Sequence, residues 1–208
     1  IILYLYFISI IFMPDFIFKL IIVGDSFTGK TSLLNKSCNN TFKDQYDATI
    51  GVDFITKLNS MSDGIVIKTH IWDTAGQRCF SNILKDYYKC AAGIIYVFDK
   101  GNKRSFENIK YWMNEVQGNN IPTILIGNKI DKSSNVSRET AEIFALEHGM
   151  TYIETSARQY INTDDFLDTF ITDIYNNMDK NMVGININNK KFKKEVTTEK
   201  SKCCCCIS

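Results

Sequence analysis

Residues 16–31 read FIFKLIIVGDSFTGKT, and this stretch decides the fold. Its first half, Phe16 to Val23, is an apolar run of the kind that forms a buried strand. Gly24 to Thr31 then fit the pattern G-x-x-x-x-G-K-[ST], and Lys30 to Cys38 predict a helix. Between a strand and a helix, such a loop curls backbone N–H groups around phosphate, and the helix N-terminus adds positive partial charge. The stretch therefore predicts a phosphate-binding α/β protein.

The loop supplies most of the predicted phosphate-binding residues. In a loop of this type the lysine, here Lys30, reaches the β- and γ-phosphates, and the hydroxyl of Thr31 binds Mg²⁺. The predicted phosphate-binding residues of the loop are Asp25, Ser26, Phe27, Thr28, Gly29, Lys30, Thr31 and Ser32. Many ATPases share this element, so other segments must identify the base.

Apolar strand-like runs alternate with amphipathic stretches from Phe16 onward, which is the pattern of an α/β fold with a mostly parallel sheet. The predicted strands are 16–23, 52–61, 65–72, 93–98, 123–126 and 151–154. The predicted helices are 30–38, 81–90, 105–117, 138–147 and 164–178, with Asp164 as an N-cap. The turn signal Ser62-Asp63-Gly64 predicts a hairpin. We therefore expect a six-stranded sheet with one antiparallel edge strand and helices on both faces.

The composition suits one globular domain followed by a tail. The 208 residues are 45% hydrophobic, which is enough for one sizeable core but not for two full domains. Beyond about residue 180 the sequence shifts to Asn, Lys, Thr and Glu without periodicity, so we expect a globular domain at 13–180 and a flexible tail at 181–208. The net charge of +1 gives no overall field toward nucleic acid, which is not an expected partner.

Residues 1–12 are almost wholly apolar, but a helix that spans a bilayer needs about 20 residues. Neither a basic leader nor a small-residue cleavage site accompanies them. Met13 is followed at once by Pro14-Asp15 and the first strand. We therefore expect translation to start at Met13, with 1–12 a non-native extension; a membrane segment truncated at its start is the other interpretation.

Two further segments follow predicted strands and point to guanine. Asn128-Lys129-Ile130-Asp131 comes after strand 123–126, at the carboxyl end where such folds bind ligands. The carboxylate of Asp131 can accept both N1–H and the 2-amino group of guanine, a donor pair that adenine does not present. Ser156-Ala157-Arg158 follows strand 151–154 and can place backbone amides near the guanine O6. An N-K-x-D tetrapeptide alone is equally typical of a solvated turn, so the inference depends on all three motifs.

In this order and spacing, the motifs resemble the Ras-like small GTPases from about Phe16 to Met178, which implies the P-loop GTPase fold. The resemblance implies that Phe42 packs against the guanine face. It also implies that the Thr49 hydroxyl joins Thr31 on Mg²⁺ while its backbone N–H senses the γ-phosphate. The implied guanine-binding residues are Phe42, Asn128, Lys129, Asp131, Ser156, Ala157 and Arg158.

Residues 73–77, Asp-Thr-Ala-Gly-Gln, resemble switch II of the same superfamily. The resemblance implies that Asp73 holds Mg²⁺ through water, that Gly76 donates its backbone N–H to the γ-phosphate, and that Gln77 orients the attacking water. Gln77, Lys30 and Thr49 are then the expected catalytic residues. Thr31, Thr49 and Asp73 are the expected metal site, and Mg²⁺ with GTP or GDP is the expected cofactor set.

Within the superfamily, the stretch after Thr49 resembles the effector-facing strand of the Rab family. The implied effector-binding residues are Ile50, Gly51, Val52, Asp53, Phe54 and Trp72. Phe54, Trp72 and Tyr87 would form a nucleotide-dependent patch if they are exposed, since exposed aromatic patches mark binding sites; otherwise they are simply core. The resemblance implies a regulator of vesicle trafficking, a monomer whose partners are an exchange factor, a GTPase-activating protein, effectors, and an escort protein or GDP-dissociation inhibitor.

Two departures from the Rab pattern concern regulation and hydrolysis. Arg78-Cys79 stands after Gln77 where most Rabs carry Glu-Arg, which puts recognition by regulators in doubt. Phe27 replaces the usual small residue of the phosphate loop, and its bulk could shield or crowd the phosphate mouth. Because Gln77 is retained, we still expect slow hydrolysis.

The tail predicts a lipid anchor. Lysines at 190, 191, 193 and 194 form a small basic cluster that anionic lipid would attract, although such runs are often only solvated linkers. The terminal Cys205-Cys206-Ile207-Ser208 fits C-a-a-X with farnesyl, whereas resemblance to Rab tails implies geranylgeranyl on both Cys205 and Cys206. Two chains anchor persistently where one does not. We therefore expect the protein on the cytoplasmic face of intracellular membranes, with a soluble cytosolic pool.

Two alternative functions remain at this stage. A catalytically inactive, nucleotide-bound scaffold would use the fold as an interaction module, but the retained Lys30, Thr31, Thr49, Asp73 and Gln77 argue against it. A small kinase with the same phosphate loop would need an arginine-rich lid over its acceptor. No such segment stands out in the sequence.

Overall fold

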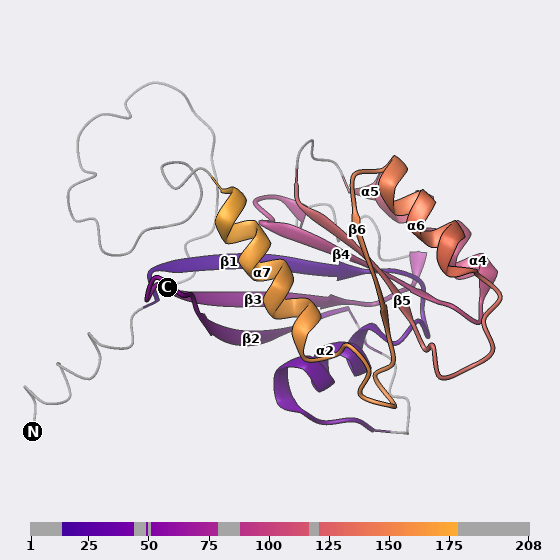
Figure 1. Ribbon diagram of the computed structural model, residues 1–208, viewed down its shortest axis with the longest axis horizontal. Helices are drawn as coiled ribbons and strands as arrows, with labels where there is room; N and C mark the ends of the chain where they lie inside the picture. Colours follow the sequence, from indigo (N-terminus) through magenta and orange to yellow (C-terminus); the bar gives the residue numbers. More distant parts are fainter. Residues whose placement is uncertain (1–13, 44–48, 50, 79–87, 117–120, 179–208) are drawn as a thin grey trace, which may run out of the picture.

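A six-stranded sheet forms the centre of the structure, a computed structural model that describes residues 14–43, 49, 51–78, 88–116 and 121–178 (Figure 1). The strand order is β2-β3-β1-β4-β5-β6. The strands are β1 (Phe16–Val23), β2 (Val52–Ser60), β3 (Val66–Thr74), β4 (Gly93–Asp99), β5 (Thr123–Asn128) and β6 (Thr151–Thr155). The β2–β3 pair is antiparallel and the other four pairs are parallel. The predicted fold class is confirmed.

The antiparallel edge follows from the turn between β2 and β3. The N–H of Met61 donates to the carbonyl of Ile65 at 2.8 Å, and Gly64 takes a positive φ of 85° that glycine adopts without strain. Side chains of β2 alternate between half-buried and exposed, as expected for an edge strand with one solvated face. The hydroxyl of Tyr175 donates to Asp63 at 2.6 Å and ties this turn to the last helix.

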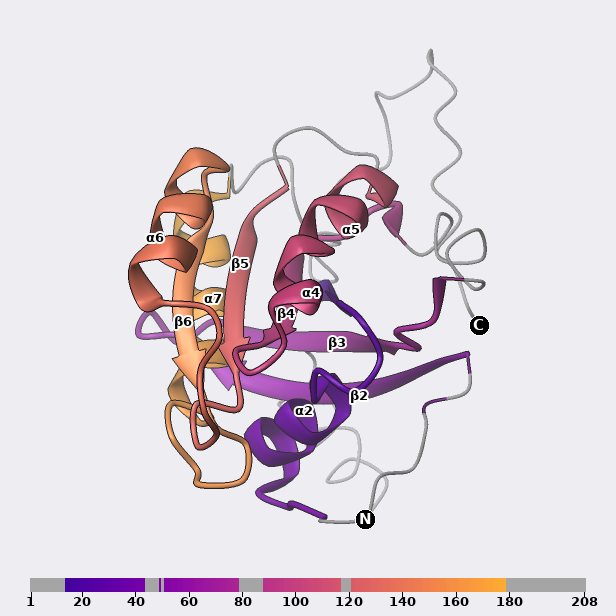
Figure 2. The ribbon, with the colours of Figure 1, turned by 90° about the vertical axis from the view of Figure 1, so that its right-hand side faces the viewer.

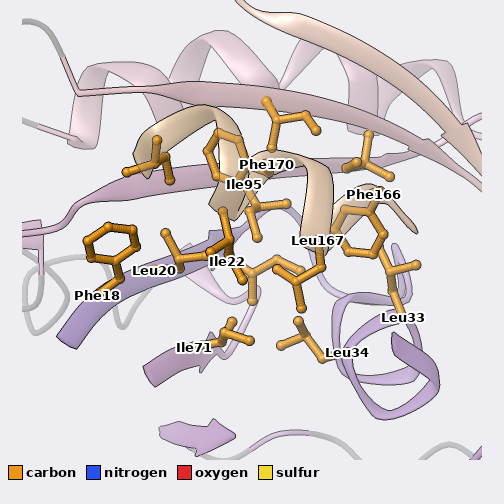
Figure 3. Packing of buried hydrophobic residues seen from close by; sticks show 14 of the residues in the cluster. Phe18, Leu20, Ile22, Leu33, Leu34, Ile71, Ile95, Phe166, Leu167 and Phe170 are labelled. Carbon is orange, nitrogen blue, oxygen red and sulfur yellow. The ribbon is translucent and has the colours of Figure 1, made fainter. Parts of the chain in front are cut away.

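The helices cover both faces of the sheet (Figure 2). On one face, α2 (Lys30–Asn39) and α7 (Asp165–Asn177) pack against apolar side chains of β1, β3, β4 and β5. Figure 3 shows the centre of this core, where Phe166, Leu167 and Phe170 of α7 meet the strands. On the other face lie α4 (Lys103–Glu107), α5 (Ile109–Glu115) and α6 (Arg138–Glu147). Burial on both faces explains why β1 and β4 are nearly continuous apolar runs.

The structure corrects the sequence prediction at two helices. The single helix expected at 105–117 is two helices that meet at Asn108, and α4 begins after Asn102, whose side chain accepts from the N–H of Arg104 at 3.1 Å. Asp164 does precede α7, but its side chain makes no capping hydrogen bond. Most of the expected helix at 81–90, and the proposed segments 1–12 and 181–208, lie outside the described residues. No helix in the described ranges is long and apolar enough to cross a membrane.

Candidate functional site

Two cavities adjoin at the carboxyl ends of the parallel strands, where the motif residues were expected to meet. One cavity, of about 290 Å³, is lined by Ser26, Phe27, Gly29, Lys30, Thr31, Ser32, Asn35, Thr41, Lys43, Thr49, Thr74, Gly76 and Gln77. The other, of about 270 Å³, is lined by Phe27, Gly29, Ser32, Phe42, Lys43, Asn128, Lys129, Asp131, Lys132, Ala157 and Arg158. The first therefore gathers the predicted phosphate residues other than Asp25 and Thr28, and the second gathers the predicted base residues other than Ser156.

The phosphate loop depends on two glycines at its ends. Gly24 has a φ of 149°, and a Cβ atom on it would lie 2.1 Å from the carbonyl oxygen of Val97. Gly29 has a φ of 90°, and a Cβ atom on it would lie 2.5 Å from Nδ2 of Asn128. Both positions therefore exclude other residues, and the loop is pressed against β4 and the start of the N-K-x-D segment.

Lys30, at the start of α2, is only 6% exposed. Its Nζ donates to the carbonyls of Gly24 and Asp25, each at 2.9 Å. Burial lowers the pKa of this ammonium from 10.5 to about 8, although the negative charges of Asp73 and Asp25 oppose the shift. A cation held in this way inside the loop is suited to pair with an anion in the adjoining cavity.

The three predicted metal ligands come together from three separate segments. The Thr31 hydroxyl donates to Oδ2 of Asp73 at 2.5 Å, and it lies 2.9 Å from the Thr49 hydroxyl. Asp73 is 2% exposed, and its Oδ1 has no hydrogen-bond partner among the described residues. Burial raises the pKa of this carboxyl, and the hydrogen bond from Thr31 and the charge of Lys30 oppose that shift. Carboxylate and hydroxyl oxygens are hard ligands, so the set fits Mg²⁺.

Gly76 presses the end of β3 onto the phosphate loop. Its carbonyl accepts the N–H of Ser26 at 3.0 Å. A Cβ atom on Gly76 would lie 2.3 Å from the nitrogen of Ser26 and 2.4 Å from the carbonyl carbon of Asp25, so only glycine fits. The next residue, Gln77, is exposed and lines the phosphate cavity beside Thr49. The structure therefore brings together all three predicted catalytic residues: Lys30, Thr49 and Gln77.

The base motif is fixed by hydrogen bonds that reach across the site. Asn128 is buried; its Nδ2 donates to the carbonyl of Thr28 at 2.9 Å, and its Oδ1 accepts from the Thr155 hydroxyl at 3.1 Å. The Ser156 hydroxyl donates to Oδ1 of Asp131 at 2.6 Å. These bonds connect the phosphate loop, the N-K-x-D segment and the Ser-Ala-Arg segment, and they hold Asp131 at the wall of the base cavity.

Lys129 connects the N-K-x-D segment to the phosphate loop and to the end of β4. Its Nζ lies 2.8 Å from Oδ2 of Asp99 and also donates to the carbonyl of Phe27. Its φ of 65° is one that non-glycine residues rarely adopt. Sequence reasoning missed Asp99 and Thr155 as supporting residues, although both stand at the carboxyl end of a strand, β4 or β6, where a site residue is expected.

One predicted phosphate residue directs its side chain elsewhere. The carboxylate of Asp25 accepts from Nδ2 of Asn108 at 2.6 Å and from Nε1 of Trp112 at 2.8 Å. The side chain of Asp25 thus faces α5, and only its backbone carbonyl meets Lys30. Nothing in the sequence motif signals Asn108 or Trp112, because both belong to a segment that only the tertiary structure brings alongside the loop.

The predicted effector strand presents an exposed aromatic surface. Phe54 is 53% exposed, and its ring centroid lies 5.6 Å from that of the half-buried Trp72 on β3. Tyr88 and Tyr96, in contrast, are buried core residues.

Ile50, Tyr87 and Cys79 lie outside the described residues. The guanidinium of Arg78 stacks over the ring of Tyr111 at 4.3 Å from its centroid.

Comparison with known proteins agrees with this geometry. The sequence profile of the Ras family matches residues 19–176. The chain is 44% identical over 154 residues to the GTP-binding protein YPTM2 of Zea mays, covering 71% of this chain and 75% of that protein. It is 43% identical over 157 residues to the Ras-related protein RABD2c of Arabidopsis thaliana, covering 73% of this chain and 77% of that protein. It is 38% identical over 175 residues to the Ras-related protein Rab-8A of Bos taurus, covering 82% of this chain and 84% of that protein.

Proposed function

The chain belongs to the Ras family, as a Rab-type small GTPase of vesicle trafficking, and from this premise we propose that the two adjoining cavities are its GTP/GDP switch. In this proposal the triphosphate enters the cavity lined by the phosphate loop, and guanine enters the cavity lined by Asp131. The residues at the join of the two cavities then contact the sugar.

The phosphate loop binds the β- and γ-phosphates through its backbone N–H groups and through Lys30. The N-terminus of α2 faces this cavity and adds positive partial charge. The ammonium of Lys30, held by the carbonyls of Gly24 and Asp25, exchanges part of this contact for phosphate oxygens. Because it is buried, its attraction to the phosphates is weakly screened.

Thr31, Thr49 and Asp73 hold Mg²⁺ between the protein and the phosphates. The ion that these residues would hold would supply positive charge, which would neutralise the negative charge that develops on the phosphates during hydrolysis. The buried Oδ1 of Asp73, which has no partner among the described residues, supports this assignment. A site with one carboxylate suits Mg²⁺, which usually takes its remaining ligands from water and substrate phosphates.

The γ-phosphate is sensed by Thr49 and Gly76, and the attacking water is oriented by Gln77. Thr49 lies three positions before the start of β2 at Val52, and Gly76 lies two positions after the end of β3 at Thr74, so contacts to one phosphate oxygen would hold both segments. Hydrolysis removes those contacts, and the two segments relax. Catalysis in this design is positioning and charge stabilisation, which fits slow hydrolysis in the absence of an activator.

The base is recognised by Asp131, with Phe42 on the guanine face and Ser156 to Arg158 around O6. The bond from Ser156 to Asp131 at 2.6 Å supports this role because it fixes one carboxylate oxygen and so orients the whole group toward the cavity. Asn128 and Lys129 support the base site by bracing it against the phosphate loop. The preference for guanine arises from two donors, N1–H and the 2-amino group, that meet one carboxylate.

Partners bind the face formed by β2 and β3. The effector surface comprises Ile50, Gly51, Val52, Asp53, Phe54 and Trp72, and the exposure of Phe54 supports it. A GTPase-activating protein and an exchange factor contact the switch segments, and an escort protein or GDP-dissociation inhibitor binds the lipidated form. In this proposal the GTPase itself is a monomer.

Membrane attachment uses the C-terminal cysteines. Geranylgeranyl groups on Cys205 and Cys206 give two chains, which anchor persistently, and the lysines of the tail favour anionic lipid. Mass spectrometry of the native C-terminal peptide tests this directly. Two unmodified thiols at Cys205 and Cys206 would contradict the anchoring proposal and leave the nucleotide switch untouched.

The convergence of Thr31, Thr49 and Asp73 is the observation that carries the proposed switch, since it needs three distant segments in one place. Purified protein should bind GDP and GTP far more tightly than ADP and ATP, and Mg²⁺ should slow release. In single-turnover hydrolysis, Gln77→Leu should be slower by at least tenfold. The control Asn114→Leu replaces an exposed amide outside both cavities and should keep the wild-type rate. Equal rates for all three proteins would remove Gln77 from its role, and the absence of hydrolysis in all three would favour the inactive scaffold.

A further inference from the structure

Four residues line both cavities: Phe27, Gly29, Ser32 and Lys43. A nucleotide that fills both cavities places its ribose and α-phosphate against these four residues, because those groups connect the base to the outer phosphates. Gly29 and Ser32 belong to the end of the loop and the first turn of α2, so they form the floor. Phe27 and Lys43 belong to the rim, and Phe27 is the large apolar member of the set.

We propose that the side chain of Phe27 covers the ribose of the bound guanine nucleotide and slows its release. The inference rests on the proposed nucleotide site and adds a residue whose side chain the family pattern does not supply. Phe27 is 64% exposed, which leaves apolar surface that a ligand can cover. The carbon-bound hydrogens of a ribose offer an apolar surface, and burying aromatic surface against it is favourable.

The backbone of Phe27 is held in an unusual conformation at the join of the two cavities. Its φ of 65° lies in the left-handed region, where a bulky residue is an outlier and strain is tolerated only if surrounding contacts impose it. Lys129 supplies one such contact by donating to the Phe27 carbonyl, and the Thr28 hydroxyl supplies another by donating to the Asp25 carbonyl at 2.9 Å. The base motif therefore positions the residue that closes over the sugar.

A ring that covers the sugar should affect the release of GDP and of GTP equally. GDP and GTP share the ribose and the α-phosphate, so an uncharged ring at this point cannot distinguish them. Loss of the ring should speed release of both nucleotides by the same factor. Contact with the γ-phosphate would instead change only GTP, and contact with guanine would change the preference over adenine.

The test measures release of radiolabelled GDP, and of a non-hydrolysable GTP analogue, from full-length protein with Mg²⁺ present. Phe27→Ala should release both nucleotides about tenfold faster, the change expected when about half the value of a buried phenyl ring is lost. The matched control Phe27→Leu keeps apolar bulk and the same backbone demand, and it should stay within about threefold of wild type. Phe27→Gly relieves the backbone strain and should release as fast as Phe27→Ala.

The outcomes separate this inference from the proposed switch. An unchanged rate for Phe27→Ala, or a change confined to the GTP analogue, would overturn the covering role while guanine binding and hydrolysis stand. If Phe27→Leu is as fast as Phe27→Ala, loop geometry and not ring coverage sets the rate, and the inference also fails. Protein that binds no guanosine nucleotide at all would contradict the proposed function itself.

Discussion

The contact between Asp25 and α5 gives the most sharply defined energetic prediction. The carboxylate accepts from both the Asn108 amide and the Trp112 indole, and Trp112 is fully buried. Asp25→Ala removes both acceptors and leaves a buried indole N–H without a partner. The variant therefore tests whether the phosphate loop is held from the side of α5 as well as from the sheet.

The expected cost follows from the two bonds. A hydrogen bond to a charged group contributes about 1.5–3 kcal/mol, and a buried donor left without a partner costs about 1–3 kcal/mol, so Asp25→Ala should lose about 3 kcal/mol in total. For a domain of this size such a loss lowers Tm by about 6 to 12 °C. Trp112→Phe keeps an aromatic ring but removes the donor, and it should cost about 2 kcal/mol from the lost bond and the smaller ring.

The assay is a double-mutant cycle on urea unfolding at saturating GDP and Mg²⁺. The GDP affinity of each protein is measured separately so that the stabilisation due to binding can be subtracted. The coupling energy between Asp25→Ala and Trp112→Phe should be about 1.5 kcal/mol, the part of the Trp112→Phe cost that comes from the shared hydrogen bond, because the second change removes a bond that is already lost. Strictly additive effects would refute the reasoning, since they would mean that the indole and the carboxylate stabilise the fold independently.

Three further predictions address the charge, the switch and the fold. Burial sets the pKa of the Lys30 ammonium at about 8, and bound phosphate raises that pKa, so GDP binding takes up a proton above pH 8. The affinity for GDP should therefore be flat from pH 6.5 to 7.5 and should fall by up to about tenfold per pH unit above about pH 8.5. An affinity that stays constant up to pH 9.5 would contradict this prediction. Gly76→Ala should keep GDP affinity within about tenfold but abolish the conformational response to GTP, seen by limited proteolysis, because its Cβ would collide with Ser26. Tyr175→Phe removes the bond to Asp63 and should cost about 1 kcal/mol in urea unfolding without changing GDP release; faster release would link that turn to the site.

The sheet and the motif positions were predictable because local patterns determine them. The bounds of β1 and α6 agree with the sequence prediction, and the other strands differ from it by one to two residues at their ends. The continuous apolar runs and the glycine-rich loop carry this information locally. The convergence of Thr31, Thr49 and Asp73 was also predicted, although through family resemblance and not through spacing.

Tertiary contacts account for what the sequence did not reveal. The break between α4 and α5 falls at Asn108, whose amide bonds to a loop 83 positions earlier in the chain, and no periodicity within 105–117 reports that bond. The same contact turns the Asp25 side chain away from the phosphate cavity. Phe54 could not be assigned to surface or core from an alternating pattern alone, and only its exposure in the structure decides the question.

The strand register explains how a phosphate signal can reach the effector surface. Asp53 lies opposite Asp73 and Phe54 lies opposite Trp72 in the antiparallel β2–β3 pair, and the N–H of Ala75 donates to the Gly51 carbonyl at 3.0 Å. The strand that presents the proposed Mg²⁺ ligand is therefore paired with the strand that presents the exposed aromatics. When gain or loss of the γ-phosphate moves Thr49 or Gly76, the movement acts on the ends of the β2–β3 pair, next to Phe54. The edge position of β2 belongs to the proposed mechanism, because a strand that is hydrogen-bonded on one side only has fewer ladder bonds to break when it shifts.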